Sequence, residues 1–145
     1  MLKDIFSPYI FSIVLAWFGA HFIKYIIGLT KNEKRGLFSH LFLSGGMPSS
    51  HSATTVALMV TIGLYNGVES GIFGLATLFA LIVMYDSMKV RRSSGEQGTA
   101  IHQIIKEQKS NIKLPRVANG HTPTEVISGA LFGALVGYVV FLATI

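Results

Sequence analysis

Two short motifs each place a histidine just before, or at the start of, an apolar segment. The first, Gly45–Ser52, contains His51, and the second, Gly120–Val126, contains His121. A histidine titrates near neutral pH, so its imidazole ring can act as a nucleophile, an acid or a base. Two of them at the mouths of two apolar helices predict an acid and a nucleophile that face each other at a membrane surface.

The second motif has the composition of a helix N-terminus. We expect Thr122 to be the N-cap, Pro123 the first helical residue and Glu125 the residue that closes a capping box. The same carboxylate could accept a hydrogen bond from His121 and leave the other imidazole nitrogen free to attack. The residues alone leave both interpretations of Glu125 open.

The first motif combines features that attract anions. Backbone amides and hydroxyls at a glycine-rich helix start bind negative groups, and the helix dipole assists them. Here these groups belong to Gly46, Ser49 and Ser50, and His51 falls in the first helical turn. The pattern predicts an anion site beside His51.

Several charged residues lie near the ends of apolar segments. A lysine within lipid costs free energy unless it pairs with an anion or reaches the headgroups, so we expect Lys24 to contact phosphate. Asp86 ends another apolar segment and precedes Arg91 and Arg92, which are expected to bind phosphate as well. The alternative for these residues is contact with solvent or lipid headgroups.

The composition places the chain in a membrane. Half of its 145 residues are hydrophobic and 13% are charged, and the mean hydropathy of +0.53 is unusual for a soluble domain. The candidate spanning stretches are residues 5–29, 49–65, 72–85 and 123–145. We therefore expect one all-α domain over residues 1–145, a polytopic membrane helix bundle with about four spanning helices.

The basic residues gather in the two loops that follow the first and third stretches. Those loops carry ten of the 12 lysines and arginines, whereas the turn between the middle stretches carries Glu69 and no base. Since an even number of spans separates the two loops, both are expected on one side. The positive-inside rule makes that side the cytoplasmic face, here of the plasma membrane.

Two further patterns concern packing. Residues 99–113 place isoleucines largely on one side and lysines elsewhere, which predicts an amphipathic helix that lies in the headgroup layer or covers the bundle. Gly129, Gly133 and Gly137 recur every four positions, and this spacing lets helices approach closely. The contact could lie within one chain or between two chains of a homo-oligomer.

The motifs resemble those of a known superfamily. Pro48–His51 and Gly120–Gly129 are similar to two of the three signatures of the type-2 phosphatidic acid phosphatases and vanadium haloperoxidases. The run Gly45–Ala53, with Met84–Asp86 and Val90–Arg92, resembles more specifically a small divergent membrane branch of that superfamily.

The resemblance implies hydrolysis of a lipid phosphate monoester or pyrophosphate without a metal ion or other cofactor. His121 would be the nucleophile that forms a phosphohistidine, Glu125 would orient it, and His51 would protonate the leaving group. Charge stabilisation supplies most of the rate in such reactions. The residues expected to bind the phosphate are Lys24, Gly46, Ser49, Ser50, Asp86, Arg91 and Arg92.

The sequence departs from the superfamily pattern at several positions. Ser50 replaces the glycine that usually precedes the first histidine, and Glu125 replaces the usual aspartate. Lys31 stands after Lys24 where the first signature has arginine and proline, and Arg116 is displaced from the arginine that usually precedes the nucleophile.

Two functions remain open on this evidence. One is a membrane phosphatase acting on phosphatidate, phosphatidylglycerophosphate or a polyprenyl phosphate, and the other is a non-catalytic membrane protein that binds or moves anionic lipid phosphates. In both, the expected partners are membrane lipids and a phosphorylated lipid, with no nucleic acid. A metal-dependent phosphatidyltransferase fits less well because it needs several spaced aspartates.

Overall fold

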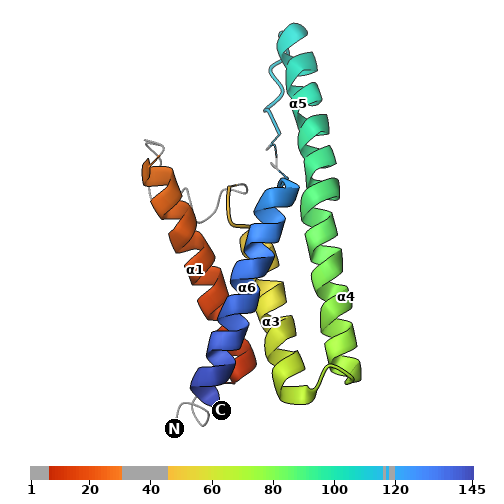
Figure 1. The fold of residues 1–145 in the computed structure, drawn as a ribbon. Helices are drawn as coiled ribbons and strands as arrows, with labels where there is room; N and C mark the ends of the chain where they lie inside the picture. The colour runs from red at the N-terminus through yellow and green to blue at the C-terminus, as the bar shows by residue number, and fades with distance from the viewer. Residues whose placement is uncertain (1–6, 31–45, 116, 118–119) are drawn as a thin grey trace.

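The computed structural model describes residues 7–30, 46–115, 117 and 120–145. Over these residues the chain is helical and contains no strands, which confirms the expected all-α bundle (Figure 1). Gly45, Lys31 and Arg116 lie outside the described residues. The elements are α1 (Pro8–Thr30), α3 (Ser50–Asn66), α4 (Gly71–Tyr85), the π-helical turn η1 (Asp86–Val90), α5 (Arg91–Glu107) and α6 (Pro123–Thr144).

The helix directions bring both histidine motifs to the same end of the bundle. Figure 1 shows α1 and α4 running one way and α3 and α6 running the other way. The N-termini of α3 and α6 therefore lie at one end, together with the C-termini of α1 and α4. His51 is in the first turn of α3, and His121 lies two residues before α6.

Among the described residues, length and composition allow three helical stretches to cross a membrane: Pro8–Thr30, Gly71–Glu107 and Pro123–Thr144. With 17 residues, α3 is shorter, and at ~1.5 Å per residue it is about 26 Å long, close to the ~30 Å hydrocarbon core. It packs against α1, α4 and α6 and is the central helix of the bundle. The path of four antiparallel segments agrees with the expectation from the sequence.

The glycine stripe of α6 packs against α3 of the same chain. A Cβ atom added at any of these glycines would clash with a backbone carbonyl oxygen of α3 or of the residue just before it. The distances would be 2.4 Å from Gly129 to Ser49, 2.2 Å from Gly133 to Ala53 and 2.7 Å from Gly137 to Ala57. The stripe therefore serves contact within one chain, one of the two alternatives. A homo-oligomer, which stays a prediction, would need a different surface.

The amphipathic helix differs in its bounds from the prediction over residues 99–113. The helix α5 ends at Glu107, and residues 110–115 are not helical. Through η1 it continues the direction of α4 beyond the ends of α1 and α6, instead of lying across the bundle (Figure 1). Residues 85–92 contain no glycine or proline that would end a helix, and the chain stays helical through them. The prediction missed this continuity because it ended the apolar stretch at Tyr85, where the charged residues begin.

We predict that Gly133→Ala destabilises the fold, because its methyl group would lie 2.2 Å from the carbonyl oxygen of Ala53. Overpacking of this kind costs about 1–3 kcal/mol, measured as a loss of unfolding free energy in detergent. Gly74→Ala is the matched control, since a Cβ there meets nothing within 4 Å and alanine favours a helix by up to ~1 kcal/mol. Equal stability of the two variants would contradict the close packing of α3 and α6.

Candidate functional site

His121 and Glu125 form a hydrogen-bonded pair at the start of α6. Nδ1 of His121 lies 2.9 Å from Oε2 of Glu125, and only 3% of His121 is exposed. Because an ionised carboxylate only accepts hydrogen bonds, Nδ1 carries the proton and Nε2 keeps a free electron pair. The arrangement orients His121 as a nucleophile would require.

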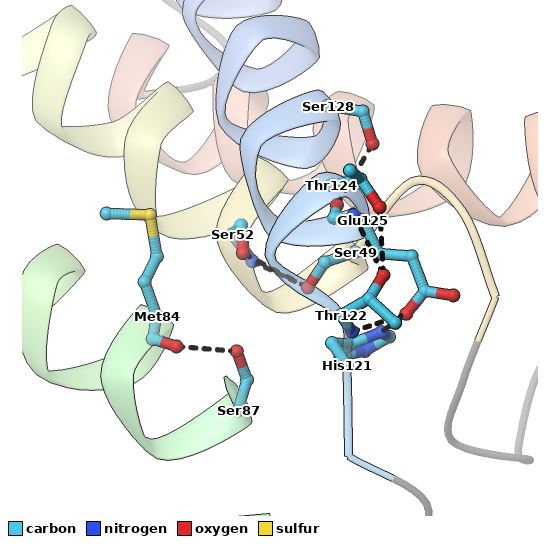
Figure 2. Close-up of polar contacts among 9 residues, drawn as sticks. All are labelled: Ser49, Ser52, Met84, Ser87, His121, Thr122, Thr124, Glu125 and Ser128. Atoms are coloured by element: carbon cyan, nitrogen blue, oxygen red, sulfur yellow. Dashed lines mark hydrogen bonds and ion pairs between the residues drawn. The ribbon is translucent and has the colours of Figure 1, made fainter. Parts of the chain in front are cut away.

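Glu125 is at the same time the capping residue of α6. Its Oε2 accepts a hydrogen bond from the Thr122 amide at 3.1 Å, while the Glu125 amide donates to the Thr122 hydroxyl at 3.4 Å (Figure 2). Both interpretations of Glu125 from the sequence therefore describe one geometry. The cap fixes the carboxylate, and the carboxylate fixes the imidazole ring.

The backbone around His121 is held by the helix that follows α4. The His121 amide donates to the Ser87 carbonyl at 2.9 Å, and a Cβ atom at Gly120 would lie 2.6 Å from the Arg92 amide nitrogen. Ser87 belongs to η1, and π-helical turns change which carbonyls are paired within a helix. Sequence reasoning missed Ser87, although it directly follows Asp86 of the family-like motif.

His51 faces His121 from the first turn of α3. The two ring centroids are 6.3 Å apart, with the rings tilted by 60°. At this separation one small group lying between the two rings can contact both of them. Nδ1 of His51 is buried and has no hydrogen-bond partner within the described residues. His51 therefore differs from His121, whose Nδ1 is bonded to Glu125.

Lys24 and Arg91 supply positive charge next to the histidines. Lys24 is on α1, is 7% exposed and interacts electrostatically with Glu125. The Arg91 Nε donates to Asp86 Oδ2 at 2.9 Å, and the charge of Arg91 acts on both histidines. The structure thus brings Lys24, Asp86 and Arg91 together with the His51–His121 pair.

Burial and neighbouring charges tune His121 electrostatically. Burial lowers the pKa of His121 below its ordinary value, and Lys24 and Arg91 act in the same direction, whereas the hydrogen bond and charge of Glu125 oppose the shift. The net effect favours the neutral imidazole at neutral pH. A neutral ring is the form that can attack phosphorus.

The other predicted phosphate ligands are placed differently. Ser49 caps α3, and its polar groups are already bonded: its amide donates to the Glu125 carbonyl at 2.9 Å, and its hydroxyl accepts from Ser52. Ser50 is buried in the first turn of α3, and Gly46 is exposed with a φ of +83°. The Arg92 Nε pairs with Glu96 at 3.2 Å.

A pocket of about 510 Å³ lies beside His121, on the side of α5. Arg92, Glu96, Thr99 and Gln103 line it, together with residues 120–122. No three His, Asp or Glu side chains within the described ranges gather as metal ligands would. The metal-free reaction stays a prediction.

Comparison with known proteins decides the family. A family model described as "Divergent PAP2 family" matches residues 6–136. The chain belongs to this family. It is also 36% identical, over 107 residues, to an uncharacterized membrane protein, YuiD, of Bacillus subtilis (strain 168), an alignment that covers 63% of this chain and 68% of the relative. No solved structure matches the chain.

Membership confirms the resemblance inferred from the motifs, and it supports the location of the chain as an integral membrane protein. Every residue of the candidate site falls within the range that the Divergent PAP2 family model matches. Family membership does not by itself assign a reaction to these residues, because the name of the relative states none.

We predict different effects for the two arginines on binding of orthovanadate or inorganic phosphate, measured by titration calorimetry in detergent. Arg91→Gln removes the charge that acts on both histidines, so the Kd should rise roughly 10- to 100-fold, as expected for a charge-assisted hydrogen bond. Arg92→Gln, the matched control, should change it by less than about threefold. A larger effect of Arg92→Gln would instead place the anion in the pocket beside α5.

Proposed function

We propose that the chain is an integral membrane phosphatase that hydrolyses a lipid phosphate monoester or pyrophosphate through a phosphohistidine. The observation that supports this most directly is the His121–Glu125 hydrogen bond, with the second histidine, His51, 6.3 Å away between ring centroids. Family membership supports the superfamily chemistry.

In the proposed first step, Nε2 of His121 attacks phosphorus and the bond to the leaving oxygen breaks. His51 gives that oxygen a proton, so the lipid leaves as an alcohol, or as a phosphate if the substrate is a pyrophosphate. The carboxylate of Glu125 stabilises the positive charge that develops on the ring of His121. Lys24 and Arg91 neutralise the charge on the equatorial oxygens.

In the second step, water attacks the phosphohistidine. His51, now neutral, accepts a proton from that water, and the bond between phosphorus and Nε2 of His121 breaks. Inorganic phosphate departs and both histidines return to their starting states. The cycle consumes one water molecule and needs no redox partner.

A non-catalytic binder of anionic lipid phosphates is the second candidate. The departures from the superfamily signatures favour it, among them Lys31 in place of the usual arginine, while Lys24 and Arg91 remain available to bind phosphate. Such a protein would bind lipid phosphates through these cations without hydrolysing them.

His121→Ala separates the two functions. We expect this change to abolish turnover of lipid phosphates while binding persists, because the cations Lys24 and Arg91 remain. His51→Ala should slow turnover by roughly 10²–10⁴-fold, the usual contribution of a general acid, and most for poor leaving groups. Rapid quench with labelled substrate should trap an acid-labile phosphohistidine in the wild type but not in His121→Ala.

Full turnover in His121→Ala would exclude His121 as the nucleophile. Loss of wild-type activity in EDTA, with recovery on adding a divalent ion, would contradict the metal-free mechanism. A wild type that binds lipid phosphates at micromolar concentration but turns none of them over would establish the binder.

We also propose that the site faces the cytoplasm from the plasma membrane. The supporting observation is charge: Lys106, Lys109 and Lys113 follow the site end of α4, whereas the hairpin at the opposite end carries Glu69. A membrane-impermeant maleimide should label Val68→Cys in intact cells, and Ser110→Cys only after permeabilisation. The chain has no cysteine of its own, so the reverse pattern would overturn this orientation.

A further inference from the structure

An apolar groove of about 970 Å³ lies between α4 and α6, with α3 as its floor. Val56 and Met59 of α3 form the floor, and Leu81 of α4 faces Ala130 and Ala134 of α6 across it. The small side chains of the two alanines create the space. The methionine can adapt to an occupant of irregular shape because its side chain is unbranched and flexible.

The groove extends to the level of the two histidines. Its lining includes Pro123, two residues after His121, and Met88, two residues after Asp86. Val56, on the floor, lies about one turn and a half beyond His51 along α3. One end of the groove therefore lies beside the cluster that carries the cations, and the rest extends along membrane-spanning helices.

The groove opens towards the surrounding lipid because α4 is attached on one side only. Of the residues of α4, Ala80 is the buried one. This helix packs on α3, and its contact with α6 is marginal at most. A hydrocarbon chain could therefore enter sideways from the bilayer.

We propose that the hydrocarbon chain of the substrate lies in this groove while its phosphate is held between His51 and His121. The inference rests on the proposed function and names the substrate class as a lipid with a long chain. Both ends of the site match such an amphiphile: Lys24 and Arg91 complement the phosphate, and the groove complements the chain.

The groove is expected to orient the substrate more than to tighten its binding. A chain that moves from the bilayer into the groove exchanges one apolar environment for another, so little hydrophobic free energy is gained. Its contribution is to hold the phosphate in line with Nε2 of His121, and small errors in such alignment are costly. The effect should therefore appear for long chains and be absent for short ones.

Filling the groove tests this selectivity. Ala134→Phe should lower kcat/KM for a long-chain lipid phosphate in bilayers by roughly 10- to 100-fold and leave a short-chain, water-soluble phosphate unchanged. Leu135→Phe is the matched control, because this neighbouring side chain is 59% exposed on the outside of α6. If Ala134→Phe fails to fold, the smaller change Ala130→Leu should show the same selectivity in weaker form.

A measurement without turnover tests occupancy directly. A long-chain phosphonate with a diazirine in its chain should label Met59, Leu81 and Ala130 on irradiation, and inorganic phosphate should compete. The same chain ending in a neutral alcohol should label the lipid-facing surface evenly. Ala134→Phe should remove the phosphonate-dependent labelling, and Leu135→Phe should keep it.

The outcomes separate this inference from the proposed function. If Ala134→Phe and Ala130→Leu lower turnover equally for long-chain and short-chain substrates, the groove does not hold the substrate chain. The same follows if labelling of the groove does not depend on the phosphonate. Either result would overturn this inference and leave the proposed phosphatase activity intact. Cross-links from the groove to a second copy of the chain would show that another protein molecule occupies the groove, and they would also overturn this inference. Phosphonate-dependent labelling without any turnover would support the groove and reject catalysis.

Discussion

The close contact between α3 and α6 is the constraint on which the candidate site depends. Gly129, Gly133 and Gly137 allow the two helices to touch along the carbonyl groups of residues 49, 53 and 57. A hydrogen bond from the Ser49 amide to the Glu125 carbonyl joins their first turns. Because the helices meet at this end, His51 and His121 are held at a fixed separation by the packing of the bundle itself.

A single carboxylate connects helix formation with chemistry at this end. Oε2 of Glu125 accepts hydrogen bonds from both the Thr122 amide and the His121 ring. The extra methylene of glutamate, compared with the usual aspartate, spans the four residues back to His121 along a capped helix start. In this chain the Glu125 carboxylate therefore reaches the imidazole ring of His121.

Charge is concentrated at one end of a molecule that is otherwise adapted to lipid. Exposed apolar residues such as Phe22, Leu75 and Leu131 cover the helices, whereas Lys24, Asp86 and Arg91 gather beside the histidines. Buried cations near a membrane surface are stable only with an anionic partner. Within the described part of this site, the carboxylates of Glu125 and Asp86 supply that negative charge, Glu125 near Lys24 and Asp86 in a hydrogen bond with Arg91.

The sequence by itself determined the membrane bundle, the helix start at Thr122–Glu125 and the two histidines, because hydropathy and capping are local properties of the chain. It could not decide how α6 packs, which arginine acts on the histidines or where α5 points. Those depend on contacts distant in sequence: the glycine stripe on α3, Arg91 turned towards Asp86, and the Ser87 carbonyl that holds His121. The groove between α4 and α6 likewise exists only in the tertiary structure. It forms because α4 and α6 both pack on α3 and hardly contact each other.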